Sequence, residues 1–421
     1  MDNNFKKNRG QFFTTRDRVL DVLVSLINNN GTILEPSAGQ GHIIKHIEKK
    51  LNRDVVGVEI DENKIKDKVC ESNIINDNFF NFLKTNDKFD TVIGNPPFVK
   101  LKNVELNTID LLPEQIRANG NLYYFFIKYC ANLLNNNGEL IFIVPKEWLY
   151  NVSSQFVRDF LSENGGFTDF IDCGEEKLFD DADVPALCIF RYQKGHKGDM
   201  KYYETIDKYH ENKFTTKKVI ITNVITFSTE RYEGKKISDY FEIKVGLVTG
   251  AEKVFKIDEN ETFDDEYMIG MVGTDKIKTK YLFLDNINDF ELLPNNLKNY
   301  LNLNKKKLIN RRIKKFDNTN WWHYGALRNI SSMNSDRRRI YGLMKTRNTN
   351  IFWEGDEFEY FNGGVVGLFL KDGLDIDMKS AIKHLNSQEF KKIMEDSNMY
   401  SNNKVSITPS VLSNLPFPFL I

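Results

Sequence analysis

The first half of the chain alternates short apolar runs with amphipathic stretches. Five apolar runs, each bounded by polar or glycine-bearing residues, predict strands at 31–34, 54–61, 74–77, 89–94 and 139–145. Apolar residues recur with helical spacing at 16–27, 43–51 and 122–134. Because strands that alternate with helices form βαβ units, we predict an α/β fold with a doubly wound, mostly parallel sheet.

Two more apolar runs, at 167–174 and 186–194, predict a hairpin-like antiparallel edge that closes this sheet. The pattern then changes, because "KGHKGDMKYY" from Lys194 onward is polar and glycine-bearing. A chain of 421 residues is long enough for about two or three domains. We place a boundary near 225–235.

We therefore predict one domain over 1–230 and a second over 231–421. The second half is less periodic and has short strand-like runs, such as 360–371, which favour a mixed α/β domain.

The composition is that of an ordinary globular protein, with 41% hydrophobic residues, 28% charged residues and a net charge of −1. No apolar run reaches the roughly 18 residues of a membrane span, and the N-terminus lacks the apolar core of a secretory signal. The cysteines Cys70, Cys130, Cys173 and Cys188 are too far apart to suggest a zinc site or a disulfide framework. We expect a cytoplasmic protein with no metal and no membrane partner.

Polar residues that can carry chemistry follow four of the predicted strands. The first strand leads into the turn "EPSAGQG", which begins at Glu35, and the second ends with Glu59. Asp77 ends the third strand and Asn95 follows the fourth. A doubly wound sheet binds its ligand at the carboxyl ends of its strands, so we expect these residues to converge on one site.

The residues at these strand ends suit a nucleoside without a pyrophosphate. The turn is neither G-x-G-x-x-G nor a phosphate-gripping P-loop, so the fingerprint of a dinucleotide such as NAD is missing. An acid at the end of the second strand, Glu59, can accept both hydroxyls of a ribose, and Asp77 can accept an adenine amine. S-adenosylmethionine fits this set, with Glu35 and the turn residues Pro36, Ser37 and Gly39 at its amino-acid end.

The tetrapeptide Asn95-Pro96-Pro97-Phe98 lies at the same sheet edge. An exocyclic adenine nitrogen is a poor nucleophile, because its lone pair is delocalised into the ring. Two acceptors on its hydrogens, the Asn95 side-chain oxygen and the Pro96 carbonyl, would localise that lone pair. The two prolines hold the acceptors in place before the reaction, and Phe98 can stack on the base.

These stretches resemble the gamma class of N6-adenine DNA methyltransferases of restriction–modification systems. The matching segments are "GQFFTT" (10–15), "LEPSAGQGH" (34–42), "VVGVEID" (55–61), "NDNFF" (76–80), "NPPF" (95–98), "NLYYFF" (121–126), "IFIVPKEWL" (141–149) and "CGEEKLFDDADVPALCIFRY" (173–192). The resemblance implies a Rossmann-like methyltransferase sheet, S-adenosylmethionine as cofactor and a C-terminal target-recognition domain. Only 17 residues separate Asp77 from Asn95, which leaves no room for that domain between them.

The resemblance also implies roles for single residues. Thr14 would meet the methionine end of the cofactor with Glu35. Ile60, Phe126 and an aromatic next to Asp77, either Phe79 or Phe80, would pack around its adenine, and Pro97 would also contact it. Phe179 would stack on a target base flipped out of the duplex, opposite Phe98. Two departures are mild: Phe98 stands where tyrosine is commoner, and Thr-Thr at 14–15 replaces the frequent Thr-Pro.

A basic stretch in the second half predicts contact with DNA phosphates. Residues 305–347 contain thirteen lysines and arginines against two acids, a local net charge of +11. We expect the Trp-Trp-His-Tyr cluster at 321–324 within it to be core packing rather than a stacking surface. The candidate contacts to double-stranded DNA are Arg311, Arg312, Arg328, Arg337, Arg338, Arg339 and Arg347.

Other activities remain as alternatives. A cytosine C5-methyltransferase needs a nucleophilic cysteine, usually after proline, and no cysteine here follows a proline. The same acceptor chemistry could serve N4 of cytosine, an amine in RNA, or a protein glutamine, and the last is the main alternative. No nuclease pattern is visible, so we expect a monomer and a cognate endonuclease, if one exists, on a separate chain.

Overall fold

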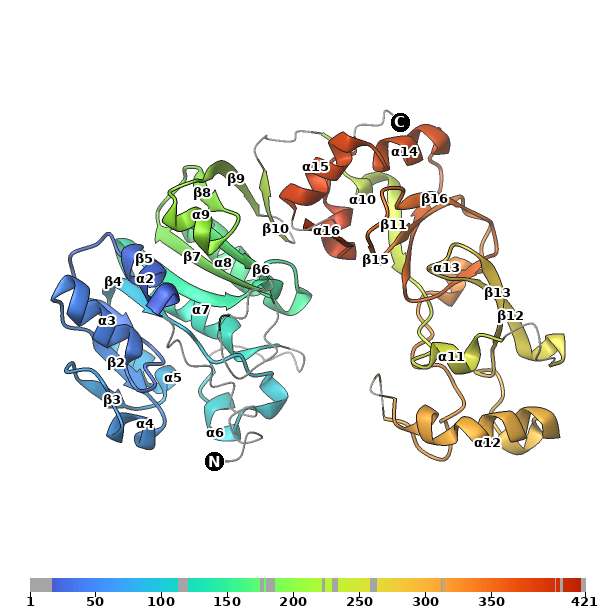
Figure 1. Ribbon diagram of the computed structural model, residues 1–421, viewed down its shortest axis with the longest axis horizontal. Helices are drawn as coiled ribbons and strands as arrows, with labels where there is room; N and C mark the ends of the chain where they lie inside the picture. Colours follow the sequence, from blue (N-terminus) through green and yellow to red (C-terminus); the bar gives the residue numbers. More distant parts are fainter. Residues whose placement is uncertain are drawn as a thin grey trace. The chain divides into compact units, whose positions relative to one another are not determined.

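A computed structural model describes most of the chain. The described residues are 17–112, 120–174, 178, 186–221, 224–228, 234–257, 263–311, 313, 315–397, 399–401 and 404–417. The chain divides into two compact units, Met1–Arg231 and Tyr232–Ile421 (Figure 1).

The N-terminal unit is built on one ten-stranded sheet with the spatial order β10-β9-β8-β6-β7-β5-β4-β1-β2-β3. Its strands are β1 (Ile33–Glu35), β2 (Val56–Glu59), β3 (Ile74–Asn76), β4 (Phe89–Gly94), β5 (Leu134–Pro145), β6 (Gly165–Gly174), β7 (Leu187–Lys194), β8 (Met200–Tyr203), β9 (Thr215–Ile221) and β10 (Ile225–Ser228). Strands β1 to β5 are mutually parallel, so their carboxyl ends share one edge of the sheet.

The seven strands predicted from the sequence are present, but β6 and β7 do not form an edge. Strand β7 pairs antiparallel with both β5 and β6, and β6 continues the sheet through a parallel pairing with β8. The antiparallel pairs β8–β9 and β9–β10 then extend it, so that the antiparallel edge strand is β10. The predicted edge at β6 and β7 was therefore wrong, because the next three strands along the chain, β8 to β10, which were not predicted, extend the sheet beyond β6.

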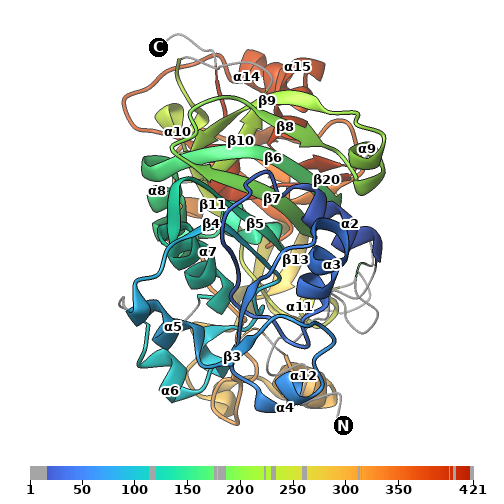
Figure 2. The same ribbon diagram turned by 90° about the vertical axis from the view of Figure 1, so that its left-hand side faces the viewer.

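Helices cover both faces of this sheet (Figure 2). They are α2 (Asp17–Ser25), α3 (His42–Leu51), α4 (Glu62–Lys66), α5 (Phe79–Phe82), α6 (Leu106–Ile109), α7 (Leu122–Asn132), α8 (Gln155–Asn164) and α9 (Ile206–His210). Successive residues of β5 point to opposite faces: Leu140 and Phe142 pack with α7 and α8, whereas Ile141 packs with α2 and α3. Burial on both faces explains why β5 is an apolar run rather than an alternating one.

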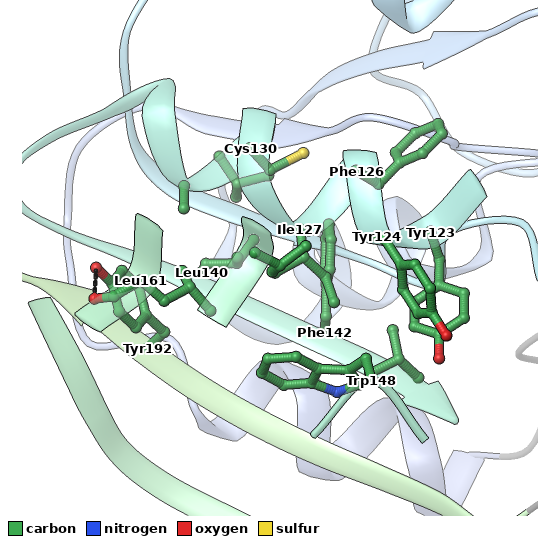
Figure 3. Packing of buried hydrophobic residues seen from close by; sticks show 14 of the residues in the cluster. Tyr123, Tyr124, Phe126, Ile127, Cys130, Leu140, Phe142, Trp148, Leu161 and Tyr192 are labelled. Carbon is green, nitrogen blue, oxygen red and sulfur yellow. Dashed lines mark hydrogen bonds between the residues drawn. The ribbon is translucent and has the colours of Figure 1, made fainter. Parts of the chain in front are cut away.

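Helix α7 lies deep in the core on one face of the sheet (Figure 3). Its residues Tyr123, Phe126 and Ile127 are at most 5% exposed, because the helix packs between the sheet and α8. The hydroxyl of Tyr192 on β7 donates to the Leu161 carbonyl of α8 at 3.1 Å. At the start of this helix the Leu122 amide donates to the carbonyl of Val99, directly after the NPPF tetrapeptide, and α7 therefore anchors that loop.

A buried ion pair holds β5 against β7 at the other end of the sheet. The Nε of Arg191 donates to Oε2 of Glu139 at 2.7 Å, and Glu139 is fully buried. Oε1 of the same carboxylate accepts from the Thr91 hydroxyl at 2.8 Å and from the backbone N–H of Asn28 at 2.9 Å. The pair is satisfied on all sides, as a buried charge must be.

The C-terminal unit contains three small sheets. The four-stranded sheet has the order β11-β18-β14-β16, and the three-stranded sheets have the orders β13-β12-β17 and β15-β20-β19. The strands are β11 (Phe241–Val245), β12 (Met268–Val272), β13 (Lys278–Leu282), β14 (Arg339–Leu343), β15 (Lys345–Thr346), β16 (Phe352–Gly355), β17 (Tyr360–Phe361), β18 (Val365–Leu370), β19 (Tyr400–Ser401) and β20 (Lys404–Ser406).

Its helices are α10 (Ile237–Tyr240), α11 (Glu252–Phe255), α12 (Asn295–Ile309), α13 (Ile330–Met333), α14 (Met378–Leu385), α15 (Gln388–Asp396) and α16 (Pro409–Ser413). The unit is thus mixed α/β, as predicted. Within the part of the chain that the structure describes, no helix is both long and apolar enough to cross a membrane.

Candidate functional site

A cavity of about 560 Å³ opens at the carboxyl ends of β1 to β4. It brings together residues that are far apart in the sequence, from Glu35 to Phe126. Of the sequence-predicted residues, those that line it are Glu35, Pro36, Ser37, Gly39, Glu59, Ile60, Asp77, Phe79, Asn95, Pro97 and Phe126. The expected convergence at one sheet edge is therefore observed.

The turn after β1 lines this cavity. Its backbone crosses to the next strand, where the Ala38 amide donates to the Val58 carbonyl at 2.9 Å. Gly39 and Gly41 have φ values of 56° and 80°, in the left-handed region that favours glycine. A side chain at Gly41 would also collide with Cys70. The two glycines let the chain turn directly from β1 into α3.

The carboxylate of Glu59 is fixed by backbone amides. Its Oε2 accepts from Gly39 N–H at 2.7 Å and its Oε1 accepts from Asp61 N–H at 2.9 Å. Burial raises the pKa of Glu59, and the amide hydrogen bonds from Asp61 and Gly39 oppose that rise. The acid therefore presents a preset acceptor to the cavity, as a ribose-binding residue would need.

The Glu35 carboxyl is more deeply buried, with 2% of its surface exposed. Its Oε2 has no hydrogen-bond partner within the described residues. Burial raises the pKa of Glu35 well above its usual value, and the charge of Glu59 adds to the rise, against a backbone hydrogen bond from Ile44. An orphaned buried acid that lines a cavity calls for a cationic or donating ligand group, such as the ammonium group of a methionine moiety.

The third strand ends in an acid beside an aromatic cluster. The Asp77 carboxylate accepts hydrogen bonds from the Asn81 side-chain amide at 3.0 and 3.1 Å and from the backbone N–H of Asn78 at 2.7 Å. The ring of Phe79 stacks on Phe126 with centroids 4.7 Å apart. Phe80 also lines the cavity, so both aromatics left open by the sequence reach it.

Ile60 stands out because it is apolar and 54% exposed where it lines the cavity. An exposed isoleucine that lines the same cavity as the stacked phenylalanines offers an apolar surface to a flat ring. The arrangement of acid and apolar surfaces fits the nucleoside half of S-adenosylmethionine.

The NPPF loop leaves β4 along the same cavity. Asn95 and Pro97 line it, and the Ser37 hydroxyl donates to the Asn95 carbonyl at 3.3 Å. Pro96 and Phe98 are not among the lining residues. The ring of Phe98 instead packs edge-on against Tyr123 of α7 with centroids 5.7 Å apart.

The loop is tied to α7 by its backbone. The Val99 amide donates to the Pro97 carbonyl at 3.1 Å, and the Leu122 amide donates to the Val99 carbonyl at 2.8 Å. These bonds, together with the two prolines, hold the loop in one conformation. Two of the residues predicted for the cofactor and the target base, Thr14 and Phe179, lie outside the described residues.

Two of the seven candidate DNA-binding arginines do not suit that role. Arg311 is 8% exposed and donates to the carbonyls of Leu308 and Trp321, both at 2.7 Å. Burial lowers the pKa of Arg311 to about 10. Arg339 is fully buried and donates to the carbonyls of Arg337 and Met333, both at 2.9 Å. The assignment of these two to DNA is corrected, because their donors already satisfy buried backbone groups.

The other candidate arginines differ in their ion pairs and in their exposure to solvent. Arg337 pairs with Glu242 at 3.2 Å and Arg338 pairs with Asp375 at 2.8 Å. Arg328 and Arg347 are exposed, and Arg312 lies outside the described residues. Trp321, Trp322 and Tyr324 are buried, as expected for core packing.

Several lining residues were missed by the sequence reasoning. His42 and Lys64 line the cavity. A second group comes from the stretch after NPPF and consists of Asn103, Val104, Glu105, Asn107 and Thr108. That stretch has neither helical nor strand periodicity, so no pattern in it signals a ligand.

The chain is similar to known methyltransferases of restriction–modification systems. Residues 24–179 match the Eco57I restriction-modification methylase family. The type II methyltransferase M.HindII of Haemophilus influenzae is 26% identical, across 99% of this chain and 90% of its own length. The modification methylase CviBIII of a Paramecium bursaria Chlorella virus is 32% identical over 33% of this chain and 38% of its own length.

Among solved structures, the type IIL restriction-modification enzyme MmeI superposes on 95% of this chain and 64% of its own, with a TM-score of 0.59 and 14% identity. That likeness supports the fold. The comparisons confirm the resemblance to type II restriction–modification methyltransferases and the Rossmann-like methyltransferase fold.

Proposed function

We propose that this chain, a relative of type II restriction–modification methyltransferases along its whole length, methylates N6 of an adenine in duplex DNA. The similarity to those enzymes supports DNA methyltransferase activity. The choice of adenine rests on the chemistry of the NPPF loop. The gamma class is supported by the order of the motifs, with the cofactor turn first, NPPF second and the second unit last.

The observation that carries the proposal is the meeting of Glu35, Glu59, Asp77 and Asn95 around one cavity. Three acids from three strand ends match the amino-acid, ribose and adenine parts of the cofactor. The asparagine stands beside them, where the methyl acceptor must approach. If NPPF were only a turn that ends β4, nothing would require Asn95 to line the same cavity as the three acids.

The cofactor supplies an electrophilic methyl group carried by a sulfonium. Glu35 would bind its ammonium group, Glu59 its ribose hydroxyls and Asp77 its adenine amine. Ile60, Phe79 and Phe126 would enclose the adenine ring, while Pro36, Ser37, Gly39 and Pro97 complete the contacts. Thr14 would contact the methionine end of the cofactor, as the family resemblance implies.

The protein's part in the transfer is to hold the acceptor amine in line and to localise its lone pair. The Asn95 side-chain oxygen and the Pro96 carbonyl would accept the two hydrogens of N6. Both acceptors are preset by the loop, so no reorganisation is required when the bond forms. Exclusion of water and in-line placement supply the remaining acceleration.

An adenine in a duplex must leave the base stack to reach this loop. We propose that Phe98 and Phe179 stack on its two faces, which would repay part of the unstacking cost at about 1–3 kcal/mol per base. The C-terminal unit would read base edges, and exposed arginines such as Arg328 and Arg347 would contact phosphates.

The test is methyl transfer from labelled S-adenosylmethionine to unmodified duplex DNA, followed by sequencing that detects modified bases. N6-methyladenine in one short sequence context supports the proposal and identifies the recognition site. If the product is N4-methylcytosine, the proposed mechanism stands but the target base is cytosine. Label in RNA or in a protein glutamine, with DNA unlabelled, would overturn the proposal and favour the main alternative.

A further inference from the structure

Residues 101–112 form a wall of the cofactor cavity to which the proposed function gives no role. This wall starts three residues after Phe98 and contains the one-turn helix η2 (Leu101–Asn103) and α6. Asn103, Glu105, Asn107 and Thr108 bring polar side chains to the cavity, and Val104 adds an apolar one. The wall is therefore continuous in sequence with the loop that would hold the target base.

One hydrogen bond joins the wall to the end of β3. The Asn78 side-chain amide donates to the Thr108 hydroxyl at 2.8 Å, and Thr108 is 7% exposed. The Asn78 side-chain oxygen caps α5 by accepting from Phe80 N–H at 3.0 Å. Both groups of this asparagine are thus used, and it sits directly after Asp77. The wall is held against the acid that would bind the adenine amine.

The start of the wall is fixed to the segment that leads into α7. The Leu101 amide donates to the Gly120 carbonyl at 3.0 Å, and the Leu101 side chain is 2% exposed in the core. Because both Leu101 and Thr108 are anchored, the stretch between them has little freedom to leave the cavity. Asn103 and Asn107 lie within that stretch, are themselves exposed, and line the cavity.

We infer that this wall is a second recognition surface for the nucleoside half of the cofactor, with Asn103 and Asn107 as binding residues and Thr108 as the positioning residue. The inference rests on the proposed function, which places S-adenosylmethionine in the cavity. The wall faces the adenine end, because it is bonded to Asn78 beside Asp77 and Phe79. Each amide side chain carries both donors and an acceptor, which suits the edge of an adenine.

The test compares Thr108→Val with Thr108→Ser in direct binding titrations without DNA. Valine keeps the shape and removes the hydroxyl, so the wall loses its tie to Asn78. We expect Thr108→Val to bind S-adenosylmethionine and S-adenosylhomocysteine about 5- to 10-fold more weakly, as for one missing hydrogen bond. The reduction should be equal for both ligands, because they share the nucleoside. Thr108→Ser should bind within about twofold of the unaltered protein.

A matched control lies in the same wall. The Leu106 side chain is 77% exposed and is not among the lining residues, so Leu106→Ala should leave both affinities unchanged. Asn107 is exposed, so we expect Asn107→Ala to keep the fold and to weaken the binding of both ligands. In turnover, Thr108→Val should raise KM for the cofactor in proportion and leave kcat unchanged, which a general loss of structure would not do.

Unchanged affinity in both Thr108→Val and Asn107→Ala would overturn the inference, and the proposed function would stand. Failure of the unaltered protein to bind S-adenosylmethionine would overturn both. Transfer of label to a substrate other than DNA would overturn the proposed function alone, since the wall acts on the cofactor and not on the methyl acceptor.

Discussion

Oε2 of Glu59 accepts a hydrogen bond of 2.7 Å from the backbone amide of Gly39. This bond joins the end of β2 to the turn after β1. The parallel pairing of β1 with β2 places the two segments side by side, and the hydrogen bond fixes them to each other. The bond gives the Gly39 N–H a hydrogen-bond acceptor, and it also orients the Glu59 carboxylate at the cavity. The turn and the acid therefore work as one unit, and a change in either should disturb the cofactor site.

Glu59→Gln should weaken S-adenosylmethionine binding by about 10-fold or more. Glutamine keeps the volume, but it replaces charge-assisted hydrogen bonds by neutral ones and turns one acceptor into a donor. Calorimetric titration measures the effect. Glu62→Gln is the matched control, because the Glu62 side chain is 67% exposed and pairs with Lys66 in the next turn. Equal reductions in the two variants would contradict the role given to Glu59.

Glu35 should make both stability and cofactor binding depend on pH. Its pKa is raised by burial and by Glu59, so the folded protein holds a proton that the unfolded chain releases above about pH 4.5. The free energy of unfolding should therefore fall as pH rises from about 4.5 through the raised pKa. Glu35→Gln should flatten that fall and stabilise the cofactor-free protein at neutral pH by about 1 kcal/mol. Denaturant unfolding at a series of pH values measures both effects.

The same acid should release a proton when a cationic cofactor binds. Below its raised pKa the carboxyl must ionise to pair with an ammonium group, so affinity should increase with pH in that window. Heats of binding measured in two buffers of different ionisation enthalpy report the released proton. Glu59, whose pKa is also raised, contributes in the same direction. Proton release that is identical in Glu35→Gln would exclude this role for Glu35.

Asn95→Ala should lower kcat by about 100-fold or more, as for the removal of one preset group in a polar site. Cofactor affinity should stay within about threefold, because the acids that bind the cofactor are unchanged. Single-turnover transfer and equilibrium binding separate the two effects. Phe98→Tyr is the control: it keeps the ring and should retain activity. Near-normal turnover in Asn95→Ala would refute the role given to this amide.

Arg328→Gln and Arg347→Gln should each weaken DNA binding and reduce the slope of log K against log salt by about 0.9 for each phosphate that is no longer neutralised. Both side chains are exposed in the C-terminal unit. Arg18→Gln removes an exposed arginine that pairs with Asp207 in the N-terminal unit, and it serves as the control. A salt slope that neither C-terminal change alters would move the DNA contacts elsewhere.

Arg339→Met should act on stability instead. Methionine keeps much of the apolar stem but leaves the carbonyls of Met333 and Arg337 without the donors of Arg339. We expect the free energy of unfolding of the C-terminal unit to fall by about 3 kcal/mol, measured by denaturant unfolding. The DNA salt slope of the folded protein should not change. A stable variant with a reduced slope would restore Arg339 to the set of arginines that contact DNA.

Much of the fold and of the cofactor site could be predicted because it depends on local pattern. The run 89–94 is strand β4 to the residue, and the helical spacing at 122–134 is α7 with two residues fewer. Glu35, Glu59, Asp77 and Asn95 each lie at the end of a strand or just after one, and parallel strands bring their carboxyl ends to one edge. The roles given to these residues stay predictions, and Thr14, Arg312 and Phe179 also lie outside the described residues.

The sequence by itself therefore determined strands β1 to β7, the helices α2, α3 and α7, the polar residues at the strand ends and the family resemblance, because periodicity, turn residues and motif order are local features of the chain. Only the tertiary structure decided that β7 lies inside the sheet, that Arg311 and Arg339 are buried, and that Thr108 ties a wall to Asn78. Each of these depends on contacts between segments distant in sequence. The sequence of a basic run does not distinguish guanidinium groups that bind phosphates from those that donate to buried carbonyls.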